Sequence, residues 1–181
     1  MRTVFNNLIS RACKPEAVVS GRVLTASASW LLIIPDFDPD VTLRVKLTEN
    51  TRRLAAMLAV RDRIEISGGI TFTRGDSPVL VAENLTRMTK ASGSAPRNYI
   101  SVSVRPGRVT RAGETFRVQF AGKLNALRTV TFRIDRDKLN PEALRAFGLR
   151  NENQKFTLSG ELKFLPGTGR TWFLVSGIAA D

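Results

Sequence analysis

Hydrophobic and polar residues alternate along several short stretches in the second half of the chain, which is typical of strands with one buried face. In one of them, Phe116, Val118 and Phe120 take every second position. Further on, Asn140-Pro141-Glu142 combines the N-cap, first-turn proline and acidic residue of a helix start, and Gly148 can end that helix. The strands predicted in this half are 99–109, 115–120, 129–135, 155–164 and 171–178.

The first half of the chain repeats this order of elements. Leu54, Met57 and Leu58 lie at helical spacing within Thr51–Val60, so a helix is predicted after the third strand here as well. The strands predicted in this half are 17–26, 30–34, 41–47, 63–72 and 78–85. Each half therefore consists of three strands, a helix and two strands.

Local sequence similarity supports an internal repeat. Thr42-Leu43-Arg44-Val45 recurs as Thr131-Phe132-Arg133-Ile134, and Ser67-Gly68 and its apolar neighbours recur around Ser159-Gly160. A solenoid needs three or more stacked units, so two copies predict two small globular domains instead. The predicted boundaries are 15–88 for the first domain, 89–97 for a linker and 98–181 for the second domain. The linker is rich in Ser, Gly, Ala and Pro and is expected to be exposed and open to proteolysis.

Three strands, a helix and two strands is the element order of the OB-fold, a five-stranded Greek-key barrel. Gly21 and Gly68 fall inside the first and fourth strands, where glycine suits the sharp coiling of a small barrel. The chain thus resembles tandem OB-fold, single-stranded nucleic-acid-binding proteins. The predicted fold class is mainly β, with two five-stranded OB-like Greek-key barrels, each carrying one helix between strands three and four.

The charge of the chain favours a polyanionic partner. The 181 residues contain 28 Lys and Arg against 16 Asp and Glu, a formal net charge of +12. Such a protein binds nucleic acid strongly through counterion release. Single-stranded DNA or RNA is therefore the predicted partner, and the sequence does not choose between them.

Few residues could support catalysis or bind a metal. The chain has no histidine and one cysteine, Cys13, which excludes histidine-based acid–base chemistry and disfavours a zinc site. Asp36, Asp38 and Asp40 lack the glycine and distal glutamate of a calcium loop and are better explained by turn formation. The chain is therefore predicted to be no enzyme, with no cofactor and no metal.

The same features suggest a compartment. A lone cysteine forms no intrachain disulfide, which favours a reducing environment such as the cytoplasm. The mitochondrial matrix is the alternative, because no acidic residue precedes Glu16. The longest apolar run, Trp30–Ile34, is too short to span a bilayer, so no membrane partner is expected.

The resemblance implies that ligands lie on the outer face around the second and third strands and in the flanking loops. Alternation predicts that Arg44, Lys46, Arg117 and Arg133 project there, opposite the core residues of their strands. The predicted nucleic-acid-binding residues are Arg22, Trp30, Arg44, Lys46, Tyr99, Arg105, Arg108, Arg117, Lys123, Arg128 and Arg133.

Two aromatic residues are the candidates for base stacking. Trp30 follows a loop of Thr, Ala and Ser residues that is expected to be flexible, and Tyr99 falls on the polar side of its strand. Trp172 begins the last strand and is expected to fill the barrel instead.

The predicted function is non-enzymatic binding of single-stranded nucleic acid, mainly through phosphate contacts and with some base stacking. The alternative is an OB-fold protein-interaction or assembly module that binds an acidic protein partner. A basic groove that runs continuously over both barrels would favour nucleic acid, whereas separate patches would favour a protein partner.

Overall fold

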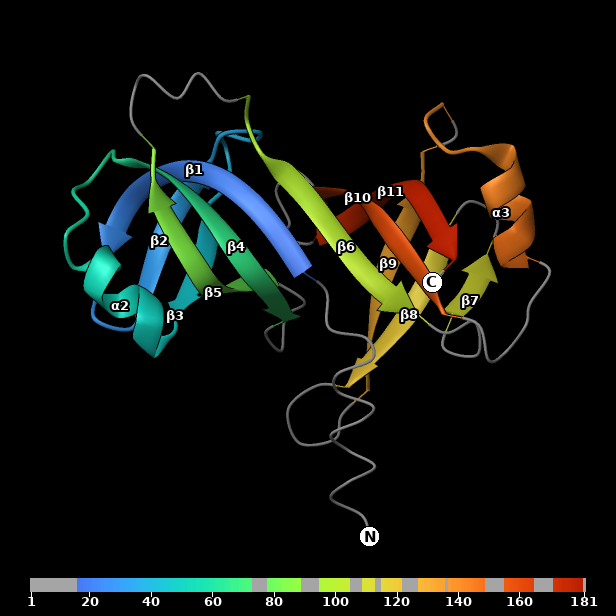
Figure 1. The fold of residues 1–181 in the computed structure, drawn as a ribbon, viewed down its shortest axis with the longest axis horizontal. Coiled ribbons are helices and arrows are strands. Elements are labelled where there is room, and N and C mark those ends of the chain that lie inside the picture. Colours follow the sequence, from blue (N-terminus) through green and yellow to red (C-terminus); the bar gives the residue numbers. More distant parts are fainter. Residues whose placement is uncertain are drawn as a thin grey trace, which may run out of the picture. The chain divides into compact units, whose positions relative to one another are not determined.

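A computed structural model describes residues 16–72, 78–88, 95–104, 109–112, 115–121, 127–135, 137–148, 155–164 and 171–180. These residues form two compact units (Figure 1), one built mainly from residues 16–99 and the other from residues 100–163 and 172–180. Both units are mainly β, as predicted.

The first unit is a closed five-stranded barrel. Its elements are β1 (Glu16–Ala26), β2 (Trp30–Pro35), β3 (Leu43–Leu47), α2 (Glu49–Ala55), β4 (Arg63–Phe72) and β5 (Pro78–Arg87). Strand β1 pairs antiparallel with both β2 and β4, and β4 continues antiparallel to β5. Strand β3 pairs antiparallel with β2 and parallel with β5, which closes the ring. This order and the helix between the third and fourth strands are those of the OB-fold.

The second unit has the same order of elements, with its first strand in two parts. Its elements are β6 (Asn98–Val104), β7 (Val109–Ala112), β8 (Thr115–Ala121), β9 (Leu127–Ile134), α3 (Pro141–Gly148), β10 (Phe156–Phe164) and β11 (Thr171–Ala180). Strand β8 pairs antiparallel with β7 and β9, β9 pairs parallel with β11, and β10 pairs antiparallel with β6. The strand predicted over 99–109, with Pro106-Gly107 interrupting or bending it, corresponds to β6 as far as Val104, and β7 begins at Val109. Pro106-Gly107 lies outside the described residues.

Alternation in the sequence correctly predicted the buried residues of β3 and, on β9, the burial of Phe132 and Ile134. On β3, Leu43, Val45 and Leu47 are buried, whereas the two residues between them are exposed. In the second unit, Phe132 and Phe173 are both 2% exposed and their rings stack with centroids 4.7 Å apart. Burial of these side chains supplies most of the free energy that holds each unit together.

The helix predicted over Thr51–Val60 was placed wrongly, because hydroxyl hydrogen bonds fix the start of α2. The amide of Thr48 donates to Thr51 Oγ1 over 3.0 Å, and the Thr48 hydroxyl donates to the carbonyl of Ala82 on β5 over 2.8 Å. These bonds turn Thr51 and Ala55 toward the barrel. Leu54 and Met57 are exposed instead of buried.

Glycines allow the fourth and fifth strands to approach closely at matching positions of the two units. A Cβ atom at Gly68 would overlap the carbonyl oxygen of Val81 on β5. A Cβ atom at Gly160 on β10 would overlap the carbonyl oxygen of Leu174 on β11. Backbone atoms cannot move aside as a side chain can, so no other residue fits without displacing a strand.

We predict that Gly160→Ala destabilises the protein by about 1–3 kcal/mol, because the new methyl group overpacks against a neighbouring backbone. Gly177→Ala is the matched control, since its methyl group would meet only the Ser159 hydroxyl, which can rotate away. Urea denaturation of the two variants measures the difference. Equal midpoints for the two variants would contradict this account of the strand contact.

An ion-paired cluster on the second unit predicts a pH dependence. Lys163 Nζ lies 2.8 Å from Glu161 Oε2, and this hydrogen bond holds the pKa of Glu161 below its ordinary value of 4.5. A carboxyl group whose pKa is lowered by folding contributes stability above its unfolded pKa and loses it as the pH falls through the folded value. We expect Glu161→Gln to lose less stability than the wild-type protein below about pH 4.5 in acid titrations followed by circular dichroism. A parallel loss in both proteins would exclude this contribution.

Candidate nucleic-acid interface

The outer side of β2, β3 and β5 forms a surface that combines two cations with half-buried apolar side chains. Arg44 and Lys46 are exposed at the positions of β3 that alternate with its core residues. Register places Arg44 opposite Leu32 and Val79, and Lys46 opposite Trp30 and Val81. We call the surface made by these residues the third-strand face; its members are Trp30, Leu32, Arg44, Lys46, Val79 and Val81.

Arg44 stacks over the indole of Trp30. Its guanidinium carbon lies 5.6 Å from the ring centroid, which is within the range of a cation–π interaction. The interaction orients the guanidinium group while its N–H groups stay available to a ligand. A planar cation held against an indole can bind a phosphate at its edge and stack against a base.

A tight turn holds Trp30 in place. The Ser27 hydroxyl donates to the Trp30 carbonyl over 3.1 Å and accepts from the Trp30 amide over 3.2 Å. The backbone amide of Ser27 also donates a hydrogen bond to the Trp30 carbonyl over 2.9 Å. The connection before Trp30, which was predicted to be flexible, runs from the end of β1 at Ala26 to the start of β2 and carries these hydrogen bonds.

The second unit carries a corresponding pair on its equivalent of β3. Arg133 on β9 is exposed, and its guanidinium carbon lies 4.7 Å from the ring centroid of Trp172 on β11. Arg133 stands opposite Leu174 in the parallel β9–β11 ladder, as Arg44 stands opposite Val79 in the first unit. Arg133 on β9 thus corresponds to Arg44 on β3. Its indole comes from β11, the parallel neighbour of β9, whereas the indole beside Arg44 comes from β2, the antiparallel neighbour of β3.

Trp172 is therefore a site residue that sequence analysis missed. It was expected to fill the barrel, but the buried aromatic of this strand is Phe173, and Trp172 is half-buried on the other side. The sequence Trp172-Phe173-Leu174-Val175 could have predicted this outward position, because only one of two adjacent strand residues can face the core.

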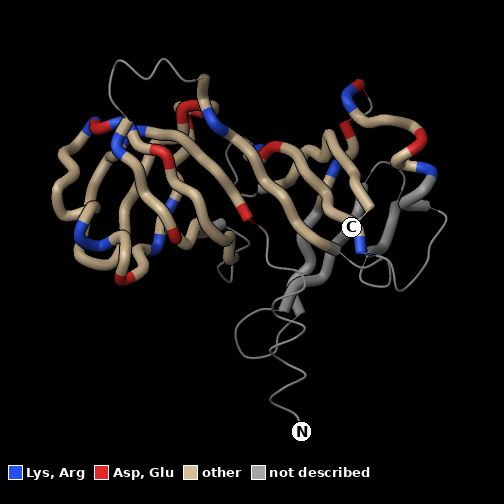
Figure 2. Tube along the Cα trace, in the orientation of Figure 1, with Lys and Arg blue, Asp and Glu red and all other residues tan. Residues whose placement is uncertain are grey.

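The cations of these faces have no acidic partner within the described residues, whereas several other cations do. Arg44, Lys46 and Arg133 form no ion pair with any described carboxylate. Figure 2 marks the basic and acidic positions along the described parts of the chain. The cations that do form ion pairs are Arg63, Arg87, Arg97, Lys138 and Lys163. The outward cations of β3 and β9 are thus among the cations that no carboxylate of the described residues neutralises.

The other predicted residues are placed less closely together. Arg22 is exposed on β1, opposite Ile34 on β2. Tyr99 is 48% exposed on β6 and is not part of the third-strand face. Register sets Arg117 opposite Thr131, and Arg128 opposite Phe120. Arg105, Arg108 and Lys123 lie outside the described residues.

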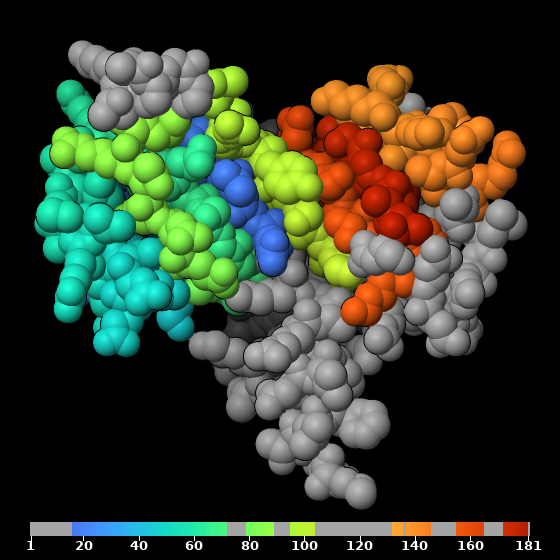
Figure 3. All heavy atoms as spheres, in the orientation of Figure 1, coloured from blue at the N-terminus to red at the C-terminus, as the bar shows by residue number. Residues whose placement is uncertain are grey.

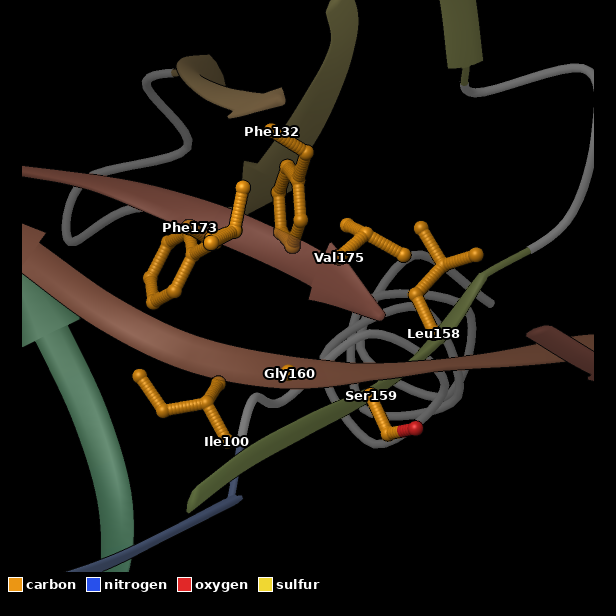
Figure 4. A pocket seen from close by; sticks show the side chains of 8 residues that line it. Ile100, Phe132, Leu158, Ser159, Gly160, Phe173 and Val175 are labelled. Atoms are coloured by element: carbon orange, nitrogen blue, oxygen red, sulfur yellow. The ribbon is translucent and has the colours of Figure 1, made fainter. Parts of the chain in front are cut away.

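A small cavity in the second unit is a packing gap between core side chains (Figure 4). It leaves room of about 10 Å³, on the order of one water molecule. Its lining is largely apolar and includes Ile100, Phe132, Leu158 and Phe173. It offers no charged group to orient a ligand.

The described residues contain no group of three or more His, Cys, Asp or Glu side chains placed to bind a metal ion. None of their helices combines the length and apolar character needed to cross a membrane.

Comparison with known proteins shows a likeness of fold. No protein-family model and no curated protein matches the chain. The fold is similar to that of the wild-type single-stranded DNA-binding protein from Thermus aquaticus, with a TM-score of 0.57 and 10% sequence identity over 93% of each chain. It is also similar to a deletion mutant of that protein, with a TM-score of 0.56 and 9% identity over 94% of this chain and 96% of the other. At this identity the likeness concerns the fold, and it extends over nearly the whole chain.

We predict that Ser27→Ala destabilises the first unit by about 1 kcal/mol, because the Trp30 backbone loses its hydroxyl partner. Ser29→Ala is the matched control, since its exposed hydroxyl forms no hydrogen bond with the described residues. Thermal denaturation followed by tryptophan fluorescence measures both variants. If Ser29→Ala destabilises as much as Ser27→Ala, the Ser27 hydroxyl does not hold the turn.

Proposed function

We propose that the protein binds single-stranded nucleic acid, without catalysis, on the third-strand face and on the corresponding surface around Arg133 and Trp172. The observation that carries this proposal is an arginine at the same position of the repeat in both units, stacked on an indole and without an acidic partner among the described residues. Phosphates would pair with the cations, and bases would stack on the indole and guanidinium planes.

The geometry of the third-strand face suits a single strand better than a duplex. Leu32, Val79 and Val81 are half-buried and flank the cations, so part of the surface is apolar. Unpaired bases can bury their faces against such a surface, whereas a duplex presents mainly phosphates to a flat sheet. This supports phosphate contacts with some base stacking as the mode of binding.

We propose DNA as the ligand. Two solved structures with a similar fold are described as single-stranded DNA-binding proteins. We also propose that the second unit is a second barrel of the same type, because β7 and β6 together make the pairings that β1 makes alone in the first unit. The domain boundaries at 15–88 and 98–181, with the linker between them, belong to this proposal.

The salt dependence of binding tests the phosphate contacts. We expect Arg44→Gln/Lys46→Gln to bind oligo(dT) more weakly at low salt, with the slope of log K against log salt shallower by about 1.4, since each phosphate contact on a single strand contributes about 0.7. The core of β3 is untouched, so the melting temperature should stay close to that of the wild-type protein. Fluorescence anisotropy across a salt series gives the slope.

Lys138→Gln/Lys163→Gln is the matched control. It removes the same two charges, but from side chains that pair with Asp135 and Glu161. Its salt slope should equal that of the wild-type protein. A change of slope in this control as large as in the Arg44 and Lys46 variant would mean that net charge, and not the third-strand face, sets the affinity. Weaker competition by oligo(U) than by oligo(dT) is the expected result for a DNA ligand.

A further inference from the structure

A second exposed surface lies at the end of α2 and in the turn that follows it. Met57 is 67% exposed, Val60 is 63% exposed and Leu54 is 45% exposed. Within the described part of the chain, these three are among only five large apolar side chains that are exposed. The segment is the teal region that ends α2 in Figure 1 and Figure 3. Large apolar side chains gathered within seven residues on a surface are typical of an interaction site.

The turn that presents these side chains is firmly held. The amide of Ala59 donates to Asp62 Oδ2 over 2.8 Å, and Arg87 Nη2 donates to Asp62 Oδ1 over 2.8 Å. The amide of Arg61 donates to the carbonyl of Val23 on β1 over 2.8 Å. The backbone of Arg61 takes φ 73°, the left-handed region that residues other than glycine seldom adopt. A surface that is fixed in advance loses less entropy on binding a partner.

The bond between Arg61 and β1 also brings a fourth apolar residue to this corner of the unit. Leu24 directly follows Val23 on β1 and is 43% exposed. Met57 has an unbranched, polarizable side chain that adapts to partners of different shape. The apolar part of the surface therefore suits one or a few hydrophobic side chains of a partner.

Three arginines flank these apolar residues in the sequence. Arg52, Arg53 and Arg61 are exposed, and none forms an ion pair with a carboxylate of the described residues. Glu49 lies in the first turn of α2 and forms no ion pair with these arginines, and Asp62, next to Arg61, is already paired with Arg87. The surface thus carries positive charge in need of a partner, and guanidinium groups pair best with carboxylates.

We propose that this surface, made by Leu54, Met57 and Val60 with Arg52, Arg53 and Arg61, binds an acidic peptide segment of a partner protein that also carries apolar side chains. The charge of the arginines selects carboxylates, and the exposed apolar side chains select hydrophobic residues between them. The surface belongs to a helix and a turn, not to β2, β3 and β5, so the partner would bind without occupying the third-strand face.

Fluorescence anisotropy with a short labelled peptide of Asp and Glu, with Leu or Phe at every third or fourth position, tests the proposal. Met57→Ser/Val60→Ser and Arg52→Gln/Arg53→Gln should each weaken peptide binding about tenfold or more. Both should leave oligo(dT) affinity and the melting temperature unchanged, since every substituted residue is exposed. A second peptide with Ser in place of its apolar residues should bind as weakly to the wild-type protein as the first peptide does to Met57→Ser/Val60→Ser.

Arg44→Gln/Lys46→Gln is the reciprocal control, and it should weaken oligo(dT) binding while peptide affinity stays at the wild-type value. The proposal is overturned if the two peptides bind alike, or if all variants bind the first peptide as the wild-type protein does. It is also overturned if Arg52→Gln/Arg53→Gln loses oligo(dT) affinity and keeps the peptide, because these arginines would then belong to the path of the nucleic acid.

Discussion

Closure of the first barrel depends on a backbone contact that only glycine permits. At Gly68 the fourth strand approaches the carbonyl of Val81 so closely that a Cβ atom has no room. The strand register shifts at this point, between Ser67 and Gly68, and β5 is then free to pair in parallel with β3. That parallel ladder sets Arg44 opposite Val79. A Cβ atom at Gly160 would likewise overlap a carbonyl oxygen of β11, so the second unit contains a similar close approach of two strands.

The chemistry of the surface follows from this closure. Because every second residue of β3 is buried in the core, the two residues between them face outward, and both are cations. Each unit then provides an indole beside its outward arginine, although Trp30 comes from β2 and Trp172 from β11. The arginines thus take corresponding positions on β3 and β9, while the strand that supplies the indole differs between the two units. A guanidinium group stacked in this way loses less conformational entropy when it binds a phosphate, because its orientation is already fixed.

Much of the fold could be predicted from the sequence, because period-two alternation is a direct consequence of a strand with one buried face. The range of β4 was predicted correctly, and the positions of Arg44, Lys46 and Arg133 opposite their core neighbours were as expected. The errors occurred where long-range hydrogen bonds outweigh local pattern. The bond from Thr48 to β5 decides which face of α2 is buried, and no periodicity within residues 51–60 reveals it. The pairing of Trp172 with Arg133 likewise depends on strands far apart in the sequence.

The central claim is that the outward arginine of the third strand and its indole partner together form the ligand surface in both units. The chain contains two tryptophans, so its indole N–H groups give two signals in a proton–nitrogen NMR spectrum, assignable with Trp30→Phe and Trp172→Phe. Titration with oligo(dT) should shift both signals in proportion to the bound fraction, while the backbone amides of Lys138 and Glu161 stay in place. Both indole signals unmoved at saturation, in a protein that binds the oligonucleotide, would contradict the account.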